Sequence, residues 1–318
     1  MAVLSYNLSP KIAGHLKNID LLRQKILTMP VSPRNELRLR WEANLQKLYW
    51  SLTLSGNNLG KSDMITLIAF QWENKLTVAQ KEVVNYKKGL DYIRENWWVN
   101  PKPVSANVIL KLYELSCKAT TPPSLNSFKA AKADIEKFLD YLNTGSEHPV
   151  LQAAIAQIHI LGIAPFVSGN GRVSRLLTYL YLYKTGYDVR EMLVFDEYLR
   201  VDLVTLREAV ESVRRYKTLT LWFEYFTEGV EKNLSRVYED LSSPQFKTHL
   251  TQSFWKLNER QKKVLNILEQ PGERITTKKV VELFKISPIT ASRDLSKMEK
   301  LGILFAHGKG RSVYYTRA

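Results

Sequence analysis

Apolar residues recur at helical spacing along most of this chain. The first such run covers residues 10–27, and a break follows it. After the break, Ser32 is placed to cap a second helix that has Pro33 at its first position. The apolar stripe that predicts this helix has intervals of three and four residues and consists of Leu37, Trp41, Leu45, Leu48 and Leu52.

Further stripes of the same period predict a mostly helical protein. Ser105 is expected to cap a helix that runs through Leu115, and residues 151–163 are apolar at nearly every position, which is typical of a buried central helix. The remaining inward positions are Val83, Tyr86, Leu90, Ile93 and Trp97; Phe128, Ala131, Ile135, Phe138 and Leu142; Leu203, Leu206, Val210 and Val213; and Trp222, Phe226, Val230, Leu234 and Val237.

A glycine-rich turn follows the central apolar segment. Pro165 ends the helix before it, and apolar positions after Gly171 predict a new helix. Gly169 and Gly171 allow a sharp turn that exposes backbone N–H groups beside the positive end of the new helix dipole. Arg172 and Arg175 lie on one face of its first turn, where cations are favourable only with an anion. These residues predict a phosphate or carboxylate site; the alternative is a helix connection with two solvated arginines.

Residues 164–175 read APFVSGNGRVSR and resemble the Fic (Fido) motif HPFx(D/E)GNGRxxR. The resemblance implies an all-helical fold and transfer of AMP from ATP to a protein hydroxyl group. It also implies that Phe166 anchors the loop in the core. The residues implied to bind the phosphates of ATP, or of another nucleotide, are Gly169, Asn170, Gly171, Arg172 and Arg175.

Two departures from the motif affect the chemistry. Ala164 stands where the family has the histidine that deprotonates the target hydroxyl, and Ser168 stands where it has the acidic ligand of Mg²⁺. Loss of a general base typically costs roughly two to four orders of magnitude in rate, and a neutral serine binds Mg²⁺ only weakly. We therefore expect a nucleotide-binding protein of the Fic adenylyltransferase (AMPylase) type whose transfer activity is lost or strongly reduced.

The end of the second predicted helix resembles another Fic element. Residues 51–56 read SLTLSG and match the inhibitory pattern (S/T)xxxE(G/N) at Ser51 and Gly56, but Ser55 replaces the glutamate that pairs with the second motif arginine. The resemblance implies an inhibitory segment that lacks the glutamate needed to block productive ATP binding. The alternative is a plain helix end followed by glycine. Because Ser55 departs together with the two reactive positions, we interpret all three as natural divergence rather than engineered change.

Residues 255–318 have a different pattern, with three short helices and a hairpin around a basic glycine turn. Their order resembles a winged helix-turn-helix of the bacterial regulator type, in which the third helix is the recognition helix. The hydroxyl and cationic side chains expected to contact DNA are Thr290, Ser292, Arg293, Lys297, Lys309 and Arg311. The alternative is a winged helix that serves only protein contact or dimerisation.

Composition and charge agree with this division. The 318-residue chain carries a formal charge of +15, and residues 251–318 alone hold 14 Lys and Arg against 6 Asp and Glu, which favours an anionic partner for that part. The single Cys117 fits a reducing cytoplasm and a small buried side chain. We see no signal-peptide pattern, expect no membrane span, and find no Cys/His cluster with the spacing of a metal site.

The predicted fold class is mainly α: a Fic-type helical bundle with a small winged-helix (α+β) domain at the C-terminus, an arrangement known among bacterial Fic proteins. We expect an N-terminal helical region at 1–100, the Fic core at 101–245 and the winged helix-turn-helix at 255–318. Within the core, residues 118–124 are predicted to form a turn shorter than the flap that holds the target polypeptide in active Fic enzymes.

The expected partners are a nucleotide, DNA and a target protein that the sequence does not name, with a homodimer left open. The alternative function is that of a DNA-binding transcriptional regulator that uses the Fic core as a nucleotide sensor or scaffold.

Overall fold

The computed structural model describes residues 5–69, 76–97, 102–117, 125–242, 257–268, 273–300, 303–308, 310 and 313–317. The chain divides into two units, Met1–Glu239 and Asp240–Ala318. The predicted turn at 118–124 lies outside the described residues. In the described part of the chain, none of the helices combines the length and the apolar run that a helix needs to cross a bilayer.

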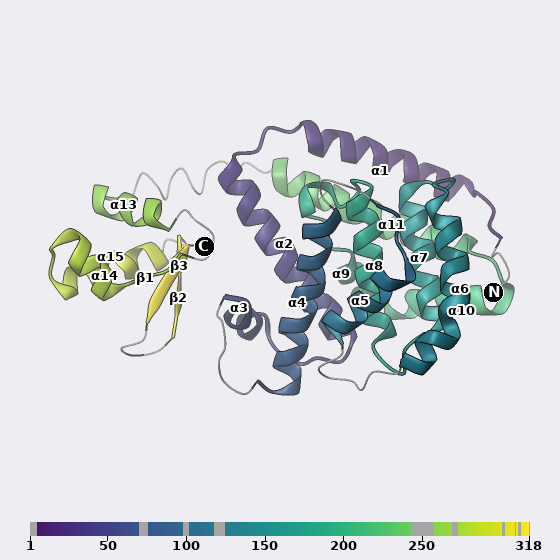
Figure 1. Cartoon of the computed structure of the whole chain (residues 1–318). Helices are drawn as coiled ribbons and strands as arrows, with labels where there is room; N and C mark the ends of the chain where they lie inside the picture. Colours follow the sequence, from purple (N-terminus) through teal and green to yellow (C-terminus); the bar gives the residue numbers. More distant parts are fainter. Residues whose placement is uncertain are drawn as a thin grey trace. The chain divides into compact units, whose positions relative to one another are not determined.

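The first unit is built from helices, as predicted (Figure 1). In chain order they are α1 (Pro10–Thr28), α2 (Pro33–Leu54), α3 (Lys61–Ala69), α4 (Val78–Trp97), α5 (Ala106–Ser116), α6 (Leu125–Asn143), α7 (Pro149–Ile163), α8 (Asn170–Lys184), the 3₁₀ helix η1 (Val189–Glu191), α9 (Phe195–Val201), α10 (Leu203–Tyr216) and α11 (Thr220–Ser242).

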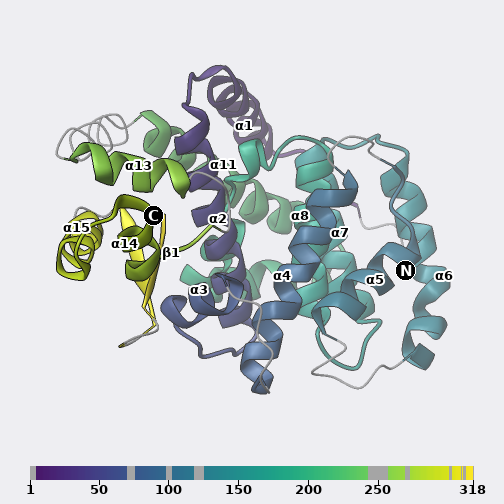
Figure 2. The ribbon, with the colours of Figure 1, turned by 60° about the vertical axis from the view of Figure 1, so that its left-hand side comes forward.

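The helices α7 and α8 form the centre of this unit. Every residue at 150–160 of α7 and at 172–182 of α8 is buried, which confirms the predicted central helix. They pack against each other, and α4, α5 and α2 also pack against α8 (Figure 2). The loop between α7 and α8 is therefore held by the most buried part of the unit.

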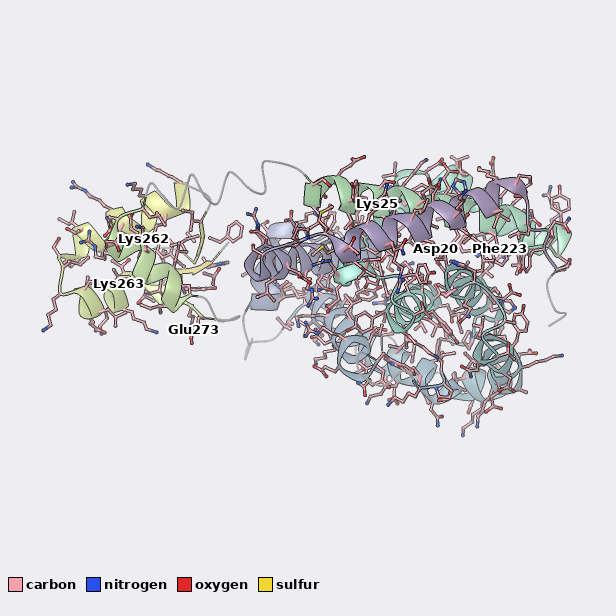
Figure 3. All side chains as sticks on the ribbon, turned by 90° about the horizontal axis from the view of Figure 1, so that it is seen from above. Asp20, Lys25, Phe223, Lys262, Lys263 and Glu273 are labelled. Carbon is pink, nitrogen blue, oxygen red and sulfur yellow. The ribbon has the colours of Figure 1, made fainter. Side chains whose placement is uncertain are left out.

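The helix α1 lies along α11, and the two helices run parallel to each other. Ser9 Oγ donates to Glu224, Lys11 pairs with Glu228, and His15 contacts Glu231. Further along, the Lys25 ammonium lies over the Tyr238 ring, 5.6 Å from its centroid. Figure 3, where Lys25 marks α1 and Phe223 marks α11, shows the two helices side by side. The two ends of this unit's sequence thus brace each other.

Local sequence signals for the helix starts were largely correct. The Ser32 side chain accepts a hydrogen bond from the Asn35 N–H and caps α2, with Pro33 next to it, as predicted. Ser105 occupies the N-cap position of α5, but its side chain makes no capping hydrogen bond, so that part of the prediction was wrong. The short helices α3 and α9 were not predicted, because nine and seven residues give too few turns for a periodic stripe.

The predicted apolar stripe of α2 is only partly buried. Its last three positions lie in the core, whereas the side chains of Leu37 and Trp41 are 53% and 42% exposed. The first turns of α2 are held instead by polar contacts on another face. There Glu36 accepts a hydrogen bond of 2.9 Å from the Arg190 guanidinium, and Arg40 donates one of 3.1 Å to the Arg190 carbonyl on η1. Polar tethers, rather than burial, thus fix this end of α2.

The second unit has the element order of a winged helix. It comprises α13 (Glu259–Ile267), β1 (Ile275–Thr276), α14 (Thr277–Phe284), α15 (Pro288–Lys300), β2 (Leu304–His307) and β3 (Tyr314–Arg317). The predicted hairpin forms the antiparallel pair β2 and β3, and β3 also pairs with β1, a two-residue strand that the sequence did not predict. Thr276 caps α14, since its side chain accepts a hydrogen bond from the Lys279 N–H.

One buried carboxylate connects the first and third helices of this unit. Asp294 of α15 accepts hydrogen bonds from Arg260 Nε at 2.6 Å and from Gln261 Nε2 at 2.9 Å on α13. A third bond of 3.3 Å comes from Asn258 Nδ2. Because these donors satisfy a carboxylate that is only 7% exposed, they fix the direction of α15 relative to α13. The opposite face of α15 stays in contact with solvent.

Candidate functional site

The loop between α7 and α8 begins at a strained residue. Ala164 ends α7 with φ +47° and ψ +59°, in the left-handed region that alanine rarely adopts. Two residues later, the Phe166 ring stacks on the Tyr113 ring with centroids 3.9 Å apart, and the Phe128 ring lies 5.5 Å away. Phe166 is buried. Aromatic packing therefore anchors the loop in the core, as the motif resemblance implied.

Asn170 closes this loop with its side chain. Its Oδ1 accepts a bond of 3.0 Å from the Phe166 N–H, and its Nδ2 donates a bond of 2.6 Å to the Phe166 carbonyl. The side chain of Asn170 therefore has a structural role in the loop, because both of its polar atoms are hydrogen-bonded to the Phe166 backbone.

Gly169 is required at the start of α8 by both conformation and space. It has φ +83°, and a Cβ atom built there would lie 2.7 Å from the sulfur of Cys117. Cys117 is fully buried, which confirms the expected small core side chain, and burial raises the pKa of its thiol. Because glycine brings no side chain to the N-cap, the first N–H groups of α8 are not capped by it and face the loop.

Arg175 projects from the first turns of α8 to the end of α2. Its Nε donates to Ser51 Oγ at 2.7 Å, and its Nη2 donates to the Ser51 carbonyl at 2.9 Å and to Ser55 Oγ at 2.6 Å. The segment that resembles the inhibitory element therefore lies against the second motif arginine. Arg175 is only 8% exposed, and all three of these acceptors are neutral.

Arg172 has a charged partner instead. Its Nη1 donates to Glu82 Oε1 on α4 at 3.0 Å, and the two side chains are 8% and 17% exposed. The other oxygen of Glu82 accepts a bond of 2.8 Å from Asn57 Nδ2. We did not predict a role for Glu82, because one acidic residue beside a buried helical stripe gives no local signal of its partner.

Asp196 of α9 is a second acidic residue that the sequence did not point to. It is 1% exposed, and neither carboxylate oxygen has a hydrogen-bond partner among the described residues. Burial raises the pKa of this carboxyl to about 6, although the Arg175 guanidinium, the Ser51 hydroxyl and the Lys47 ammonium act in the opposite direction. With a pKa of about 6, this carboxyl is mostly ionised at neutral pH, and it interacts electrostatically with the Arg175 guanidinium.

The residues at the loop do not fit Mg²⁺. Ser168, at the position of the expected acidic ligand, is exposed and brings one neutral hydroxyl group. Within the described ranges, no three His, Cys, Asp or Glu side chains come together in a way that could hold a metal ion. Mg²⁺ prefers carboxylate and phosphate oxygens, so this donor set does not form a site for it.

The structure places part of the predicted DNA-contacting set on one surface. Ser292, Arg293 and Lys297 are exposed on α15. Thr290 is half-buried, and its hydroxyl lies 2.9 Å from Ser287 Oγ at the start of the helix, so capping engages it. Ile289, which was not predicted, is 67% exposed in the first turn. The predicted contacts Lys309 and Arg311 lie outside the described residues.

Comparison with known proteins identifies both parts of the chain. Residues 118–182 match the Fic/DOC family, and residues 260–315 match the DeoR-like helix-turn-helix domain, which confirms the two resemblances. Protein adenylyltransferase Fic of Drosophila ananassae is 23% identical over 192 residues, and that of Nematostella vectensis is 24% identical over 196 residues. Each match covers 54% of this chain but only 38% and 45% of the respective relative. The chain thus spans less than half the length of these curated relatives.

Two solved structures share the fold. A Fic family protein from Desulfovibrio desulfuricans G20 has a TM-score of 0.65 at 14% identity and covers 99% of this chain and 98% of its own. Residues 134–508 of Fic-1 from C. elegans have a TM-score of 0.57 at 20% identity, covering 72% of this chain and 71% of that one. At these identities the likeness establishes the fold alone.

The buried carboxyl of Asp196 generates a testable pH dependence. Its pKa rises from 3.8 in the unfolded chain to about 6 in the folded protein, so the folded state holds the proton more tightly and loses stability as the pH rises from about 4 to 6. Relative to the wild type, Asp196→Asn should gain about 2 kcal/mol of unfolding free energy between pH 4 and pH 8. Denaturant unfolding at both pH values measures this difference. Asp140→Asn, at an exposed position of α6, is the control, and an equal pH response of both variants would contradict the prediction.

Proposed function

Because the chain carries a Fic/DOC domain followed by a DeoR-like helix-turn-helix domain, we propose that it is a DNA-binding protein whose Fic core binds a nucleotide without efficient transfer of AMP. The observation that carries the nucleotide part is the pair of buried cations, Arg172 and Arg175, at the glycine-capped start of α8. Buried guanidinium groups beside the positive end of a helix are favourable when they bind phosphate.

The absence of efficient transfer follows from the groups at the reactive positions. The methyl group of Ala164 cannot remove a proton from a target hydroxyl, and Ser168 brings no negative charge for a metal ion. The loop that would hold the phosphates is positioned by Phe166, Gly169 and Asn170. Binding can therefore persist where catalysis is lost.

The DNA part rests on the exposed face of α15. Arg293 and Lys297 lie on it, with the Ser292 hydroxyl beside them, and the 14 Lys and Arg of residues 251–318 exceed the acidic residues by eight. This combination suits electrostatic attraction to the phosphate backbone and hydrogen bonding to base edges. We propose that the second unit reads a DNA site and that the Fic core serves as its nucleotide sensor.

Nucleotide binding should depend on Arg175. Equilibrium titration of the full chain with AMP, ADP and ATP should show binding that Arg175→Gln weakens roughly 10- to 100-fold, because charge-assisted hydrogen bonds to phosphate are lost. Arg94→Gln removes an exposed charge from α4 and should change affinity less than about threefold. Binding of none of the three nucleotides by the wild type, or an equal effect of both variants, would refute the proposed nucleotide site. Thermal unfolding checks that each variant is folded.

Transfer activity should be absent from the wild type and appear when the base is restored. Incubation with ATP and Mg²⁺, followed by intact-mass measurement of the protein, should show AMP adducts for Ala164→His because a general base returns roughly two to four orders of magnitude in rate. Adding Ser168→Asp should increase the yield by supplying a carboxylate for the metal. Ala164→Gln, which fills the same position without a base, is the control. An adduct already present on the wild type would overturn the proposed loss of transfer.

DNA binding should depend on the exposed arginine of α15. A duplex selected from random sequences by the full chain should be bound roughly 10- to 100-fold more weakly by Arg293→Gln, the cost of about 1–3 kcal/mol for a base contact. Lys263→Gln, exposed on α13, removes a charge from the same unit and should have a much smaller effect. Gel-shift titration at two salt concentrations measures both affinity and its salt dependence. Failure to select any duplex would remove the DNA-binding function.

A further inference from the structure

The two arginines at the start of α8 each interact with a carboxyl group. Arg172 and Arg175 contribute two positive charges, Glu82 forms an ion pair with Arg172, and the Asp196 carboxyl of α9 interacts electrostatically with Arg175 as well as with Lys47. A site intended for a triphosphate without a metal ion would need an excess of positive charge, because ATP carries several negative charges close together. The carboxyl groups here favour a ligand with less charge.

The two arginines differ in the charge of their hydrogen-bond partners. Arg175 donates its hydrogen bonds to the hydroxyl and carbonyl oxygens of Ser51 and Ser55, none of which is charged. Arg172 instead forms an ion pair of 3.0 Å with Glu82. A phosphate that approaches Arg175 thus meets a cation hydrogen-bonded to neutral groups, whereas one that approaches Arg172 also meets a carboxylate.

Glu82 is held in this position from its other side. Its Oε2 accepts a bond of 2.8 Å from Asn57 Nδ2, and the same amide nitrogen donates to the Ala79 carbonyl at 3.0 Å. The Asn57 Oδ1 atom accepts a bond of 3.1 Å from the Leu59 N–H. Asn57 is only 6% exposed, so the anchor is itself fixed by backbone groups on two segments. Glu82 cannot rotate away from Arg172 without losing its hydrogen bond to Asn57.

We propose that Glu82 is a specificity-determining residue that makes the loop prefer ligands with a single phosphate group, such as a nucleoside monophosphate, over polyphosphates. This inference rests on the proposed function, in which the loop binds a nucleotide. The single phosphate is bound by the N–H groups at the start of α8 and by Arg175. Glu82 keeps Arg172 neutralised, so the charge of a second or third phosphate is opposed by the carboxylate rather than balanced by the guanidinium. Ser168 brings no acidic group whose metal ion could offset this repulsion.

The test compares AMP, ADP and ATP by isothermal titration calorimetry with the full chain, without Mg²⁺ and at constant ionic strength. The affinity of the wild type should fall in that order, with AMP at least about 10-fold tighter than ATP. Glu82→Gln has nearly the same shape but no charge, and it should tighten ATP binding at least about 10-fold while changing AMP binding less than about threefold.

Two further variants separate this role from general effects. Glu95→Gln removes an equal charge from an exposed position on the same helix, α4, and should leave the order and the affinities unchanged. Glu82→Asp keeps the charge and should keep the preference for AMP. If thermal unfolding shows that Glu82→Gln is not folded, the wild-type order and the Asp variant decide the question.

Two outcomes overturn the inference alone: wild-type protein that binds ATP as tightly as AMP, or a Glu82→Gln variant that gains affinity equally for all three nucleotides. Binding of no nucleotide by either the wild type or Glu82→Gln would remove the proposed nucleotide function, and this inference with it. The order AMP, ADP, ATP in the wild type, together with its loss in Glu82→Gln, would support the assignment of Glu82 as the residue that disfavours polyphosphates.

Discussion

The burial of the Arg175 guanidinium is the constraint on which the arrangement of the site depends. A buried cation needs hydrogen-bond acceptors, and the last turn of a helix offers carbonyl groups without intrahelical partners. The end of α2 supplies the Ser51 carbonyl together with two serine hydroxyls. The negative end of α2 thereby meets the positive start of α8. One side chain joins two helices that are more than 100 residues apart in sequence, and the loop before α8 is positioned as a consequence.

In the loop between α7 and α8, the residues that determine the backbone shape differ from those at the positions implied to be reactive. The ring of Phe166, the amide of Asn170 and the absence of a side chain at Gly169 determine the path of the backbone. At the positions implied to perform chemistry, Ala164 ends α7 with a left-handed backbone, and the residues Ala164 and Ser168 are both exposed. Replacement of a reactive side chain can therefore occur without loss of the fold, because the phosphate-binding geometry is stabilised by packing that these residues do not share.

Sequence predicted the parts of the molecule whose signals are local. Helical periodicity predicted most of the helices, and the motif predicted the loop between α7 and α8. The resemblance of residues 51–56 to the inhibitory pattern predicted the segment that contacts Arg175. Glu82 and Asp196 escaped prediction because their role depends on tertiary contacts, and an isolated carboxylate carries no local pattern that names its partner. Leu37 and Trp41 follow the correct period but are exposed, since periodicity reports which side chains share a face and not whether another element covers that face.

The unequal partners of the two arginines determine which contacts a ligand can replace. Exchanging the bonds of Arg175 to neutral oxygens for bonds to phosphate gives up about 1.5–3 kcal/mol for each bond and gains bonds in which both partners are charged. Taking Arg172 from Glu82 instead leaves a mostly buried carboxylate without its partner, and breaking buried ion pairs in this way typically costs about 3–5 kcal/mol. A ligand can therefore replace the contacts of Arg175 at a lower energetic cost than those of Arg172, although both side chains are equally buried. What distinguishes the two positions is that Arg172 is hydrogen-bonded to a carboxylate and Arg175 to neutral oxygens. The proposed ligand preference of this loop therefore depends on residues of α2 and α4 rather than on the motif itself.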